Sequence, residues 1–310
     1  MEKGTDRETS GEVSMLKMPV GLYEKALPPE LSWEERLAAA GKAGYDFIDI
    51  SIDESDGRLS RLDWTASERA ELRRSIANTG VQVSTMCLSV HRKYPFGSKD
   101  PQIRRQGHEI MYKALDFSVD IGLRVVQVMA YDVFYEPSDE ETRANFMEGL
   151  ALAAKMAGQA GVMLGIENLD TPFVENASQG LAVIEEINSP WVQLYLDMGN
   201  LAAAGYHPPD ELRLAKDHLL GIHVKDAAPK VIRGIPFEEG IVPFREIFST
   251  LADIDFWGML AVEMWGYMHE DQDPYEHAAA ARRFVDDLVA EAYSADPLAD
   301  QATWLSDPQR

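Results

Sequence analysis

Short apolar runs alternate along the chain with longer stretches in which apolar residues return every three or four positions. The short runs have the length of buried strands, and the longer ones have the period of amphipathic helices. Strands are predicted at 19–23, 47–52, 83–88, 125–129, 163–167, 192–197, 220–224 and 259–263. Helices are predicted near 32–43, 66–79, 101–121, 139–159, 177–187, 209–217, 243–252 and 274–293. Strict alternation of eight strands with eight helices predicts parallel βα units.

Two α/β architectures fit such an alternation, a closed (β/α)₈ TIM barrel and an open doubly wound sheet. No Gly-rich phosphate fingerprint follows the first strand, and eight units are the number that closes a barrel. The sequence therefore favours a single barrel domain over 17–294. Residues 1–16 are polar and charged and are interpreted as a flexible leader, and residues 295–310 as a loose C-terminal tail.

Helix-boundary residues agree with this division. Ser32 and Thr65 each precede a predicted helix that carries acidic residues in its first turn, as helix N-caps do. Pro101 stands where a helix can begin. Glycines follow four predicted helices, where a left-handed residue is expected, at Gly44, Gly80, Gly122 and Gly161.

Composition narrows the possible partners and location. The chain has 310 residues, is 45% hydrophobic, and carries 52 acidic against 29 basic residues, a formal net charge of -23. Such a surface is unsuited to nucleic acid or to anionic membranes, so neither partner is expected. The single cysteine, Cys87, excludes a disulfide framework and fits a cytoplasmic protein. No run approaches the roughly 20 apolar residues of a membrane span.

Polar residues at the ends of four successive predicted strands are the main candidates for chemistry. The fifth to eighth strands supply, in order, Glu167, Asp197, His223 and Glu263. The separations are 30, 26 and 40 residues (197−167, 223−197 and 263−223), each about one βα unit. Because all strands of a parallel barrel open at the same face, these four side chains are expected to meet at one rim.

Three carboxylates that approach one another away from water repel unless a cation lies between them. Together with an imidazole they form an oxygen-rich donor set that suits Mn²⁺, Mg²⁺, Co²⁺ or Zn²⁺. A single acid at a strand end can mark only the beginning of a loop, and His223 alone can be a core histidine. Four such residues in succession favour a divalent metal site.

Basic clusters stand out in so acidic a chain and indicate where a phosphate group can bind. One follows the third strand and includes His91, Arg92 and Ser98, and another follows the seventh and includes Lys225 and Arg233. Their charges and hydroxyl or backbone donors suit phosphate oxygens. Solvated loops with ordinary surface charges remain the alternative. Other rim candidates are Tyr23, Glu24, Asp53, Glu54, Asn200 and Trp265.

Several short motifs carry a resemblance to a known family. They include Gly-Leu-Tyr-Glu-Lys-Ala-Leu-Pro at 21–28, Met-Cys-Leu-Ser at 86–89, Asp-Met-Gly-Asn-Leu at 197–201, His-Val-Lys-Asp at 223–226 and Val-Glu-Met-Trp at 262–265. Between residues 21 and 293 the chain resembles the L-ribulose-5-phosphate 3-epimerase family, also called L-xylulose-5-phosphate 3-epimerase. This family belongs to the xylose-isomerase-like TIM barrels.

The resemblance implies a metal-dependent isomerase that interconverts L-ribulose 5-phosphate and L-xylulose 5-phosphate through a cis-enediolate. It implies that Glu167, Asp197, His223 and Glu263 bind one divalent ion, and that Glu167 and Glu263 also transfer the proton. It implies that Arg233 contacts the substrate. Asn200, Glu24, His91, Arg92, Ser98 and Lys225 complete the predicted substrate-binding set. A homodimer is expected on the resemblance alone.

Three positions depart from the family pattern. Glu238 stands where glycine is expected, Asn168 where an apolar residue is expected, and Leu196 where proline is usual. The four metal-binding positions are intact, so epimerase chemistry is still predicted. Glu238 leaves the exact sugar open, because an acid near the substrate would change what binds.

Other functions remain open from the sequence. A free-ketose 3-epimerase and an aldose–ketose isomerase use the same barrel and the same intermediate. A multi-zinc endonuclease would need more histidine ligands than seven histidines comfortably supply, and a basic face. A non-catalytic sugar-binding barrel would need neither proton-transfer residue.

Overall fold

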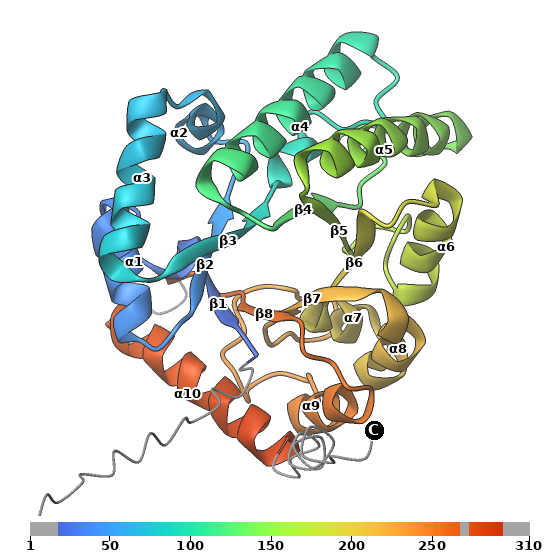
Figure 1. Ribbon diagram of the computed structural model, residues 1–310. Coiled ribbons are helices and arrows are strands. Elements are labelled where there is room, and N and C mark those ends of the chain that lie inside the picture. The colour runs from blue at the N-terminus through green and yellow to red at the C-terminus, as the bar shows by residue number, and fades with distance from the viewer. Residues whose placement is uncertain (1–17, 267–272, 294–310) are drawn as a thin grey trace, which may run out of the picture.

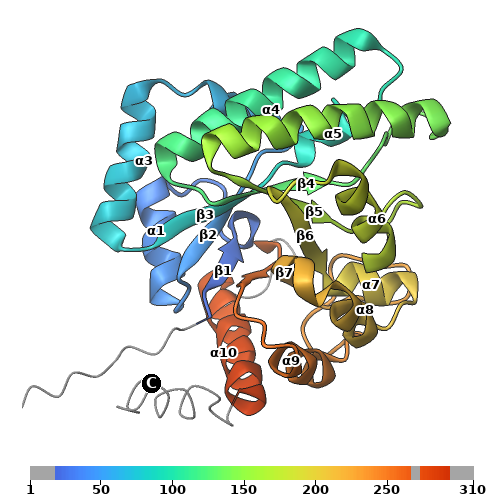
Figure 2. The same cartoon turned by 45° about the vertical axis from the view of Figure 1, so that its right-hand side comes forward.

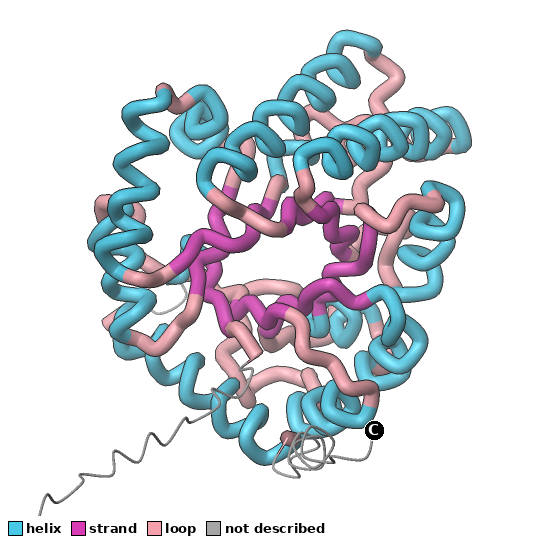
Figure 3. Tube along the Cα trace, viewed as in Figure 1, coloured by secondary structure: helices cyan, strands magenta, loops and turns pink. Residues whose placement is uncertain are grey.

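Eight parallel strands pair in chain order and close into a ring, with β8 hydrogen-bonded to β1 (Figures 1 and 3). The computed structural model describes residues 18–266 and 273–293. The strands are β1 Val20–Tyr23, β2 Phe47–Ser51, β3 Gln82–Cys87, β4 Val125–Met129, β5 Met163–Glu167, β6 Val192–Asp197, β7 Leu219–Val224 and β8 Met259–Val262. The closed barrel is confirmed, and the doubly wound sheet is excluded.

Helices surround this ring on the outside (Figures 1 and 2). The eight predicted helices are α1 Trp33–Lys42, α3 Ala66–Thr79, α4 Pro101–Ile121, α5 Glu140–Ala160, α6 Ala177–Ile187, α8 Pro208–Ala215, α9 Phe244–Asp253 and α10 Pro274–Ala292. Among the described residues, two further α-helices were not predicted, α2 Asp56–Leu59 and α7 Met198–Ala204. Both are shorter than the two turns that an amphipathic pattern needs to be recognised.

The predicted helix boundaries are largely those of the structure. Ser32 and Thr65 both form capping boxes, in which side chain and backbone bond reciprocally three residues apart. Gly80, Gly122 and Gly161 end their helices in the left-handed conformation. These local signals set where the helices between the strands begin and end.

The barrel interior is filled in layers. Phe47, Val125, Tyr195 and Ala261, one from each even-numbered strand, form a separate apolar cluster. Glycines on odd-numbered strands make room for these rings, since a Cβ on Gly221 would lie 2.3 Å from Tyr195 Cε2. Bulky side chains therefore fill this layer of the barrel.

No helix in the described part of the chain is long and apolar enough to cross a membrane. The barrel elements run from Val20 to Ala292. The leader predicted at 1–16 and the tail predicted at 295–310 lie outside the described residues, and the assignment of 17–294 as one domain stays a prediction.

Candidate active site

A cleft of about 290 Å³ opens at the carboxyl ends of the strands. Ten of the candidate residues line it: Tyr23, Asp53, Glu54, Arg92, Glu167, Asn200, Lys225, Arg233, Glu263 and Trp265. Asp197 and His223 are fully buried beneath it. The cleft therefore lies where parallel barrels carry their active sites, and the predicted metal ligands are at its floor.

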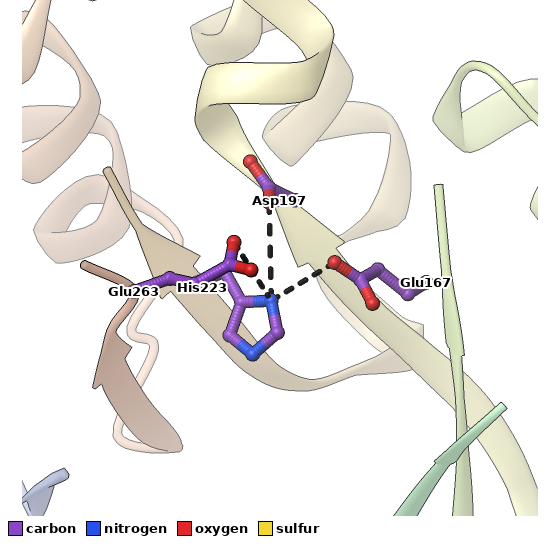
Figure 4. Close-up of side chains that lie close together, drawn as sticks. All are labelled: Glu167, Asp197, His223 and Glu263. Atoms are coloured by element: carbon purple, nitrogen blue, oxygen red, sulfur yellow. Dashed lines mark hydrogen bonds and ion pairs between the residues drawn. The ribbon is translucent and has the colours of Figure 1, made fainter. Parts of the chain in front are cut away.

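The four predicted ligands converge on one point, as Figure 4 shows. His223 Nδ1 lies 3.0 Å from Glu167 Oε1 and 3.8 Å from both Asp197 Oδ2 and Glu263 Oε2. One ligand atom from each residue lies within 4.8 Å of the others. The four side chains thus meet at one rim, as the strand positions predicted, and their role as metal ligands stays a prediction.

Strand register explains this convergence. Glu167 and Asp197 are the last residues of β5 and β6, and Asp197 pairs with His223 across β6 and β7. Glu263 follows β8 directly, and its N–H donates to the carbonyl of Val224 at 3.0 Å. Each ligand thus begins at a backbone position held by the sheet, which limits its freedom before any ion binds.

Asn168, one of the three departures, has a clear structural role. Its side chain accepts a hydrogen bond from the N–H of Asp197 at 2.7 Å and donates to the Asp197 carbonyl at 3.2 Å. Asn200 Nδ2 donates in turn to the Asn168 carbonyl at 2.9 Å. Asn168 therefore holds the backbone of Asp197, and its polarity is satisfied although it is buried.

Glu238 has no contact with the cleft. It is exposed, does not line the cleft, and adopts a φ of 70°. Glycine is the residue best suited to this left-handed backbone, which explains why glycine was expected there. The side chain therefore does not bear directly on substrate choice. Leu196, the third departure, is buried in the core.

Two cationic groups at the floor, Lys225 and His223, offset part of the charge of the three carboxylates. Lys225 Nζ lies 2.5 Å from Asp197 Oδ2 and 2.7 Å from Glu263 Oε2. Burial alone raises the pKa of Glu263, but Lys225 and His223 together hold it well below its usual value. Burial lowers the pKa of His223, but Glu167 and the other acids raise it far above its usual value. The acids at the floor are thus held in contact with positive charge.

The residues fit a divalent ion. Ligands about 2.1 Å from a common ion are roughly 3.0–3.5 Å apart, and the three carboxylate oxygens lie 3.0–3.8 Å from His223 Nδ1. Carboxylate and imidazole donors suit Mn²⁺, Co²⁺, Zn²⁺ or Mg²⁺. The cluster is able to hold one such ion.

Replacing Lys225 by methionine is expected to tighten metal binding and to destabilise the metal-free protein. The ammonium repels an incoming cation, so its loss lowers the Kd for Mn²⁺ by about tenfold, or ~1.4 kcal/mol. Without it, two buried carboxylates lose their ion pairs, which costs about 3–5 kcal/mol of unfolding free energy. Chelator competition and thermal melts of metal-free protein measure both effects. An unchanged Kd would show that Lys225 does not share the site of the ion.

Two predicted phosphate contacts, Arg92 and Arg233, do face the cleft. Arg92 lies over the Phe134 ring at 4.9 Å and donates to the Tyr131 hydroxyl at 3.2 Å. Arg233 lies over the Trp265 ring at 5.5 Å. Aromatic faces hold both guanidinium groups while leaving their N–H groups available to an anion.

His91 and Ser98 are not in the cleft. The His91 ring is buried beside Phe96, at 4.6 Å between centroids, and its Nε2 lies 3.2 Å from the Gly107 carbonyl. Burial lowers the pKa of His91 to about 4, so it carries no charge for a phosphate at neutral pH. Ser98 is also buried, and its Oγ accepts a hydrogen bond from the N–H of Asp100. Both residues, predicted to contact phosphate, instead contact α4: His91 through the Gly107 carbonyl, and Ser98 through Arg104.

Glu24 is likewise away from the cleft lining. It is fully buried and forms ion pairs with Arg58 at 2.9 Å and Arg61 at 2.7 Å. Its Oε2 also accepts the N–H of Ser51 at 3.0 Å. Glu24 therefore ties the loop after β2 to the end of β1, which is a structural role rather than a substrate contact.

Sequence reasoning missed several groups that line the cleft, among them Lys25, Ser89, Cys87 and Tyr131. Cys87 and Ser89 lie at and just beyond the end of β3, so the rule that found the metal ligands also applied to them. Tyr131 follows β4 by two residues and gave no such signal. Its role is visible only from its contact with Arg92.

Comparison with known proteins identifies the family of this chain. Residues 37–287 match the family model for the xylose isomerase-like TIM barrel. The chain is 44% identical over 276 residues to L-ribulose-5-phosphate 3-epimerase UlaE of Escherichia coli (strain SMS-3-5 / SECEC), covering 89% of this chain and 96% of that relative. The protein of the same name from Escherichia fergusonii shows the same identity and coverage.

Solved structures support the fold. A D-psicose 3-epimerase structure in the presence of D-fructose superposes with a TM-score of 0.73 at 19% identity, over 88% of this chain and 99% of that one. An L-ribulose 3-epimerase structure gives a TM-score of 0.72 at 21% identity, over 94% and 99%. The relatives that match 89% of this chain are named as epimerases, and the chain is therefore an enzyme of the epimerase class. It belongs to the L-ribulose-5-phosphate 3-epimerase family of xylose isomerase-like TIM barrels.

Proposed function

We propose that this enzyme interconverts L-ribulose 5-phosphate and L-xylulose 5-phosphate by inverting C3, with Glu167 and Glu263 as the proton-transfer pair. The observation that carries the proposal is the placement of these two carboxylates. Both line the cleft, and they reach its floor from β5 and the end of β8, on either side of Asp197 and His223. A sugar lying over that floor would have one carboxylate on each face.

Inversion at C3 of a 2-ketose requires the removal of a proton beside a carbonyl and its return on the opposite face. One glutamate acts as general base while the other supplies a proton as general acid. Glu167, Asp197, His223 and Glu263 would hold a divalent ion, which would supply Lewis acidity in favour of the enediolate. Asp197 and His223 have the holding role alone, because they are fully buried.

The cations of the cleft indicate how a phosphorylated sugar is held. Lys25 is paired with Asp53 at 2.7 Å, and Lys225 with the floor carboxylates. Arg92 and Arg233 line the cleft without an ion pair to a carboxylate among the described residues. Arg92 Nε is in addition buried without a hydrogen-bond partner. These two arginines are the anchors we propose for the 5-phosphate.

Initial rates with a small set of ketoses test the proposal. Purified enzyme loaded with Mn²⁺ is given L-ribulose 5-phosphate, free L-ribulose and D-ribulose 5-phosphate, and the products are identified by NMR. We expect L-xylulose 5-phosphate from the first substrate, with the highest kcat/KM of the three. A higher kcat/KM for free L-ribulose would identify a free-ketose 3-epimerase. An aldopentose phosphate as product would identify an aldose–ketose isomerase.

Replacing Arg92 by alanine is expected to raise KM for L-ribulose 5-phosphate by about tenfold to a hundredfold, the size of one lost charge-assisted contact. KM for free L-ribulose should change little, because that sugar has no phosphate to lose. Lys93→Ala, which alters the neighbouring cation outside the cleft lining, is the matched control. Equal changes of KM for both sugars would remove Arg92 from the phosphate site.

A homodimer and a cytoplasmic location also belong to this proposal. The single cysteine, Cys87, is buried and unpaired, as is usual in a reducing compartment. The dimer rests on the family resemblance alone. Light scattering of the purified enzyme measures its mass against the 34.6 kDa of one chain.

A further inference from the structure

A carboxylate lies inside the barrel, beneath the proposed metal site. Asp49 is the third residue of β2 and is fully buried. Barrel interiors are usually filled by branched apolar side chains, and a buried charge is costly unless it is paired. Asp49 nevertheless lies among polar side chains, Thr85 of β3 and Gln127 of β4. None of these three groups has a part in the chemistry described above.

The two oxygens of Asp49 have different surroundings. Oδ1 accepts hydrogen bonds from the Thr85 hydroxyl at 2.6 Å and from Gln127 Nε2 at 3.2 Å. Oδ2 is buried without a hydrogen-bond partner and lies 3.7 Å from His223 Nε2, a few tenths of an ångström beyond hydrogen-bond distance. His223 Nε2 is itself buried without a partner. Two unsatisfied polar atoms of complementary kind therefore face each other.

The orientation of the His223 imidazole determines which ring nitrogen faces Asp49. In Figure 4 one ring nitrogen of His223 is turned toward the three carboxylates and the other points away from them. The first is Nδ1, at 3.0 Å from Glu167 Oε1, and the second is Nε2, which faces Asp49. A neutral imidazole has one proton, and the nitrogen that carries it cannot bind a metal.

We propose that Asp49 is a positioning residue that accepts a hydrogen bond from the Nε2–H of His223 and so keeps Nδ1 free of a proton for the metal. Thr85 and Gln127 hold one oxygen of Asp49 and leave the other for His223. Metal-bound histidines commonly donate their second N–H to a carboxylate in this way. The inference deepens the proposed function, since it takes His223 as a metal ligand.

Asp49→Asn tests the proposal with little change of shape. The asparagine oxygen can still accept from Thr85 and Gln127, but its NH₂ group then faces His223 Nε2. That donor favours a lone pair on Nε2 and moves the imidazole proton to Nδ1. We expect the Kd for Mn²⁺, measured by chelator competition, to rise by about 10–100-fold.

Asp132→Asn is the matched control. Asp132 is also a buried aspartate, and it accepts the hydroxyls of Ser138 and Thr142, both at 2.6 Å, outside the metal cluster. The Kd of the Asp132→Asn variant for Mn²⁺ should equal that of the wild type. Equal Kd values for Asp49→Asn and wild type would overturn the inference. A wild type that binds no divalent metal would instead overturn the proposed function.

The unaltered protein provides a second test that does not depend on the folding of a variant. Nitrogen-15 NMR of the Zn²⁺-loaded wild type reports which nitrogen of His223 carries the proton. We expect a protonated Nε2, with its proton protected from exchange with water. A proton on Nδ1, or a rapidly exchanging Nε2–H, would show that Asp49 does not hold the ring.

Discussion

Glu167→Gln and Glu263→Gln are each expected to lower kcat for epimerisation by about 10²–10⁴-fold, the usual contribution of a positioned acid or base. An amide keeps the shape of the side chain but neither accepts nor gives the proton at C3. Both glutamates line the cleft, so the loss falls on the chemical step. KM for L-ribulose 5-phosphate should change far less than kcat, since Arg92 and Arg233 are intact.

Exchange of the C3 hydrogen with solvent separates proton transfer from metal binding in these variants. Metal content is measured for each variant, and rates are compared at equal metal occupancy. Glu185→Gln, an exposed glutamate on α6, is the matched control and should behave as the wild type. If both cleft variants, fully loaded, exchange the C3 hydrogen at the wild-type rate, the two-glutamate mechanism is wrong.

Removal of divalent metal is expected to abolish epimerisation and to lower the melting temperature. Three carboxylates at the floor then share only Lys225 and His223 as positive partners. A ligand at 1,000 times its Kd adds about 4 kcal/mol to the unfolding free energy of the folded state that binds it. Loss of that amount lowers the melting temperature of a chain of this size by several degrees.

The metal dependence is measured by dialysis against a chelator, elemental analysis, activity assays and thermal melts, followed by addition of Mn²⁺, Co²⁺, Zn²⁺ or Mg²⁺ separately. Recovery of activity identifies the ions that serve. His223→Ala should not recover with any of them at concentrations that saturate the wild type. Full activity at less than one ion per ten chains would exclude a metal-dependent mechanism.

Strand positions and the convergence of the four strand-end side chains could be predicted because both follow from local periodicity and topology. Apolar runs placed the strands within about one residue at most ends, and parallel order then required the ends to share a face. Glu167, Asp197, His223 and Glu263 needed no further information, since each belongs to a strand or follows one directly.

Loop residues could not be placed in the same way. His91 and Ser98 stand in a basic segment, but Phe96 packs on His91, His108 and Phe146 and draws that segment into the helices. Such packing is tertiary and leaves no mark on the charge pattern. Only Arg92 extends from this segment into the cleft.

The sequence around Asp49 indicates a buried charge that needs a partner. Asp49 interrupts the apolar run Phe-Ile-Asp-Ile-Ser at 47–51, and a charge within a buried strand needs a partner. The partner we propose is His223 on β7, 174 residues later (223−49), and only the closed barrel brings the two side chains to 3.7 Å. Only the three-dimensional structure shows that one carboxylate oxygen of Asp49 accepts two hydrogen bonds and the other accepts none.

Deuterium incorporation by the metal-loaded wild type tests the central claim most directly. L-Ribulose 5-phosphate is incubated with enzyme in heavy water, and the labelled carbon is identified by NMR in substrate and product. We predict deuterium at C3 of both L-ribulose 5-phosphate and L-xylulose 5-phosphate, and at no other carbon. Deuterium at C1 or C4, or formation of L-xylulose 5-phosphate without any exchange at C3, would contradict the assignment.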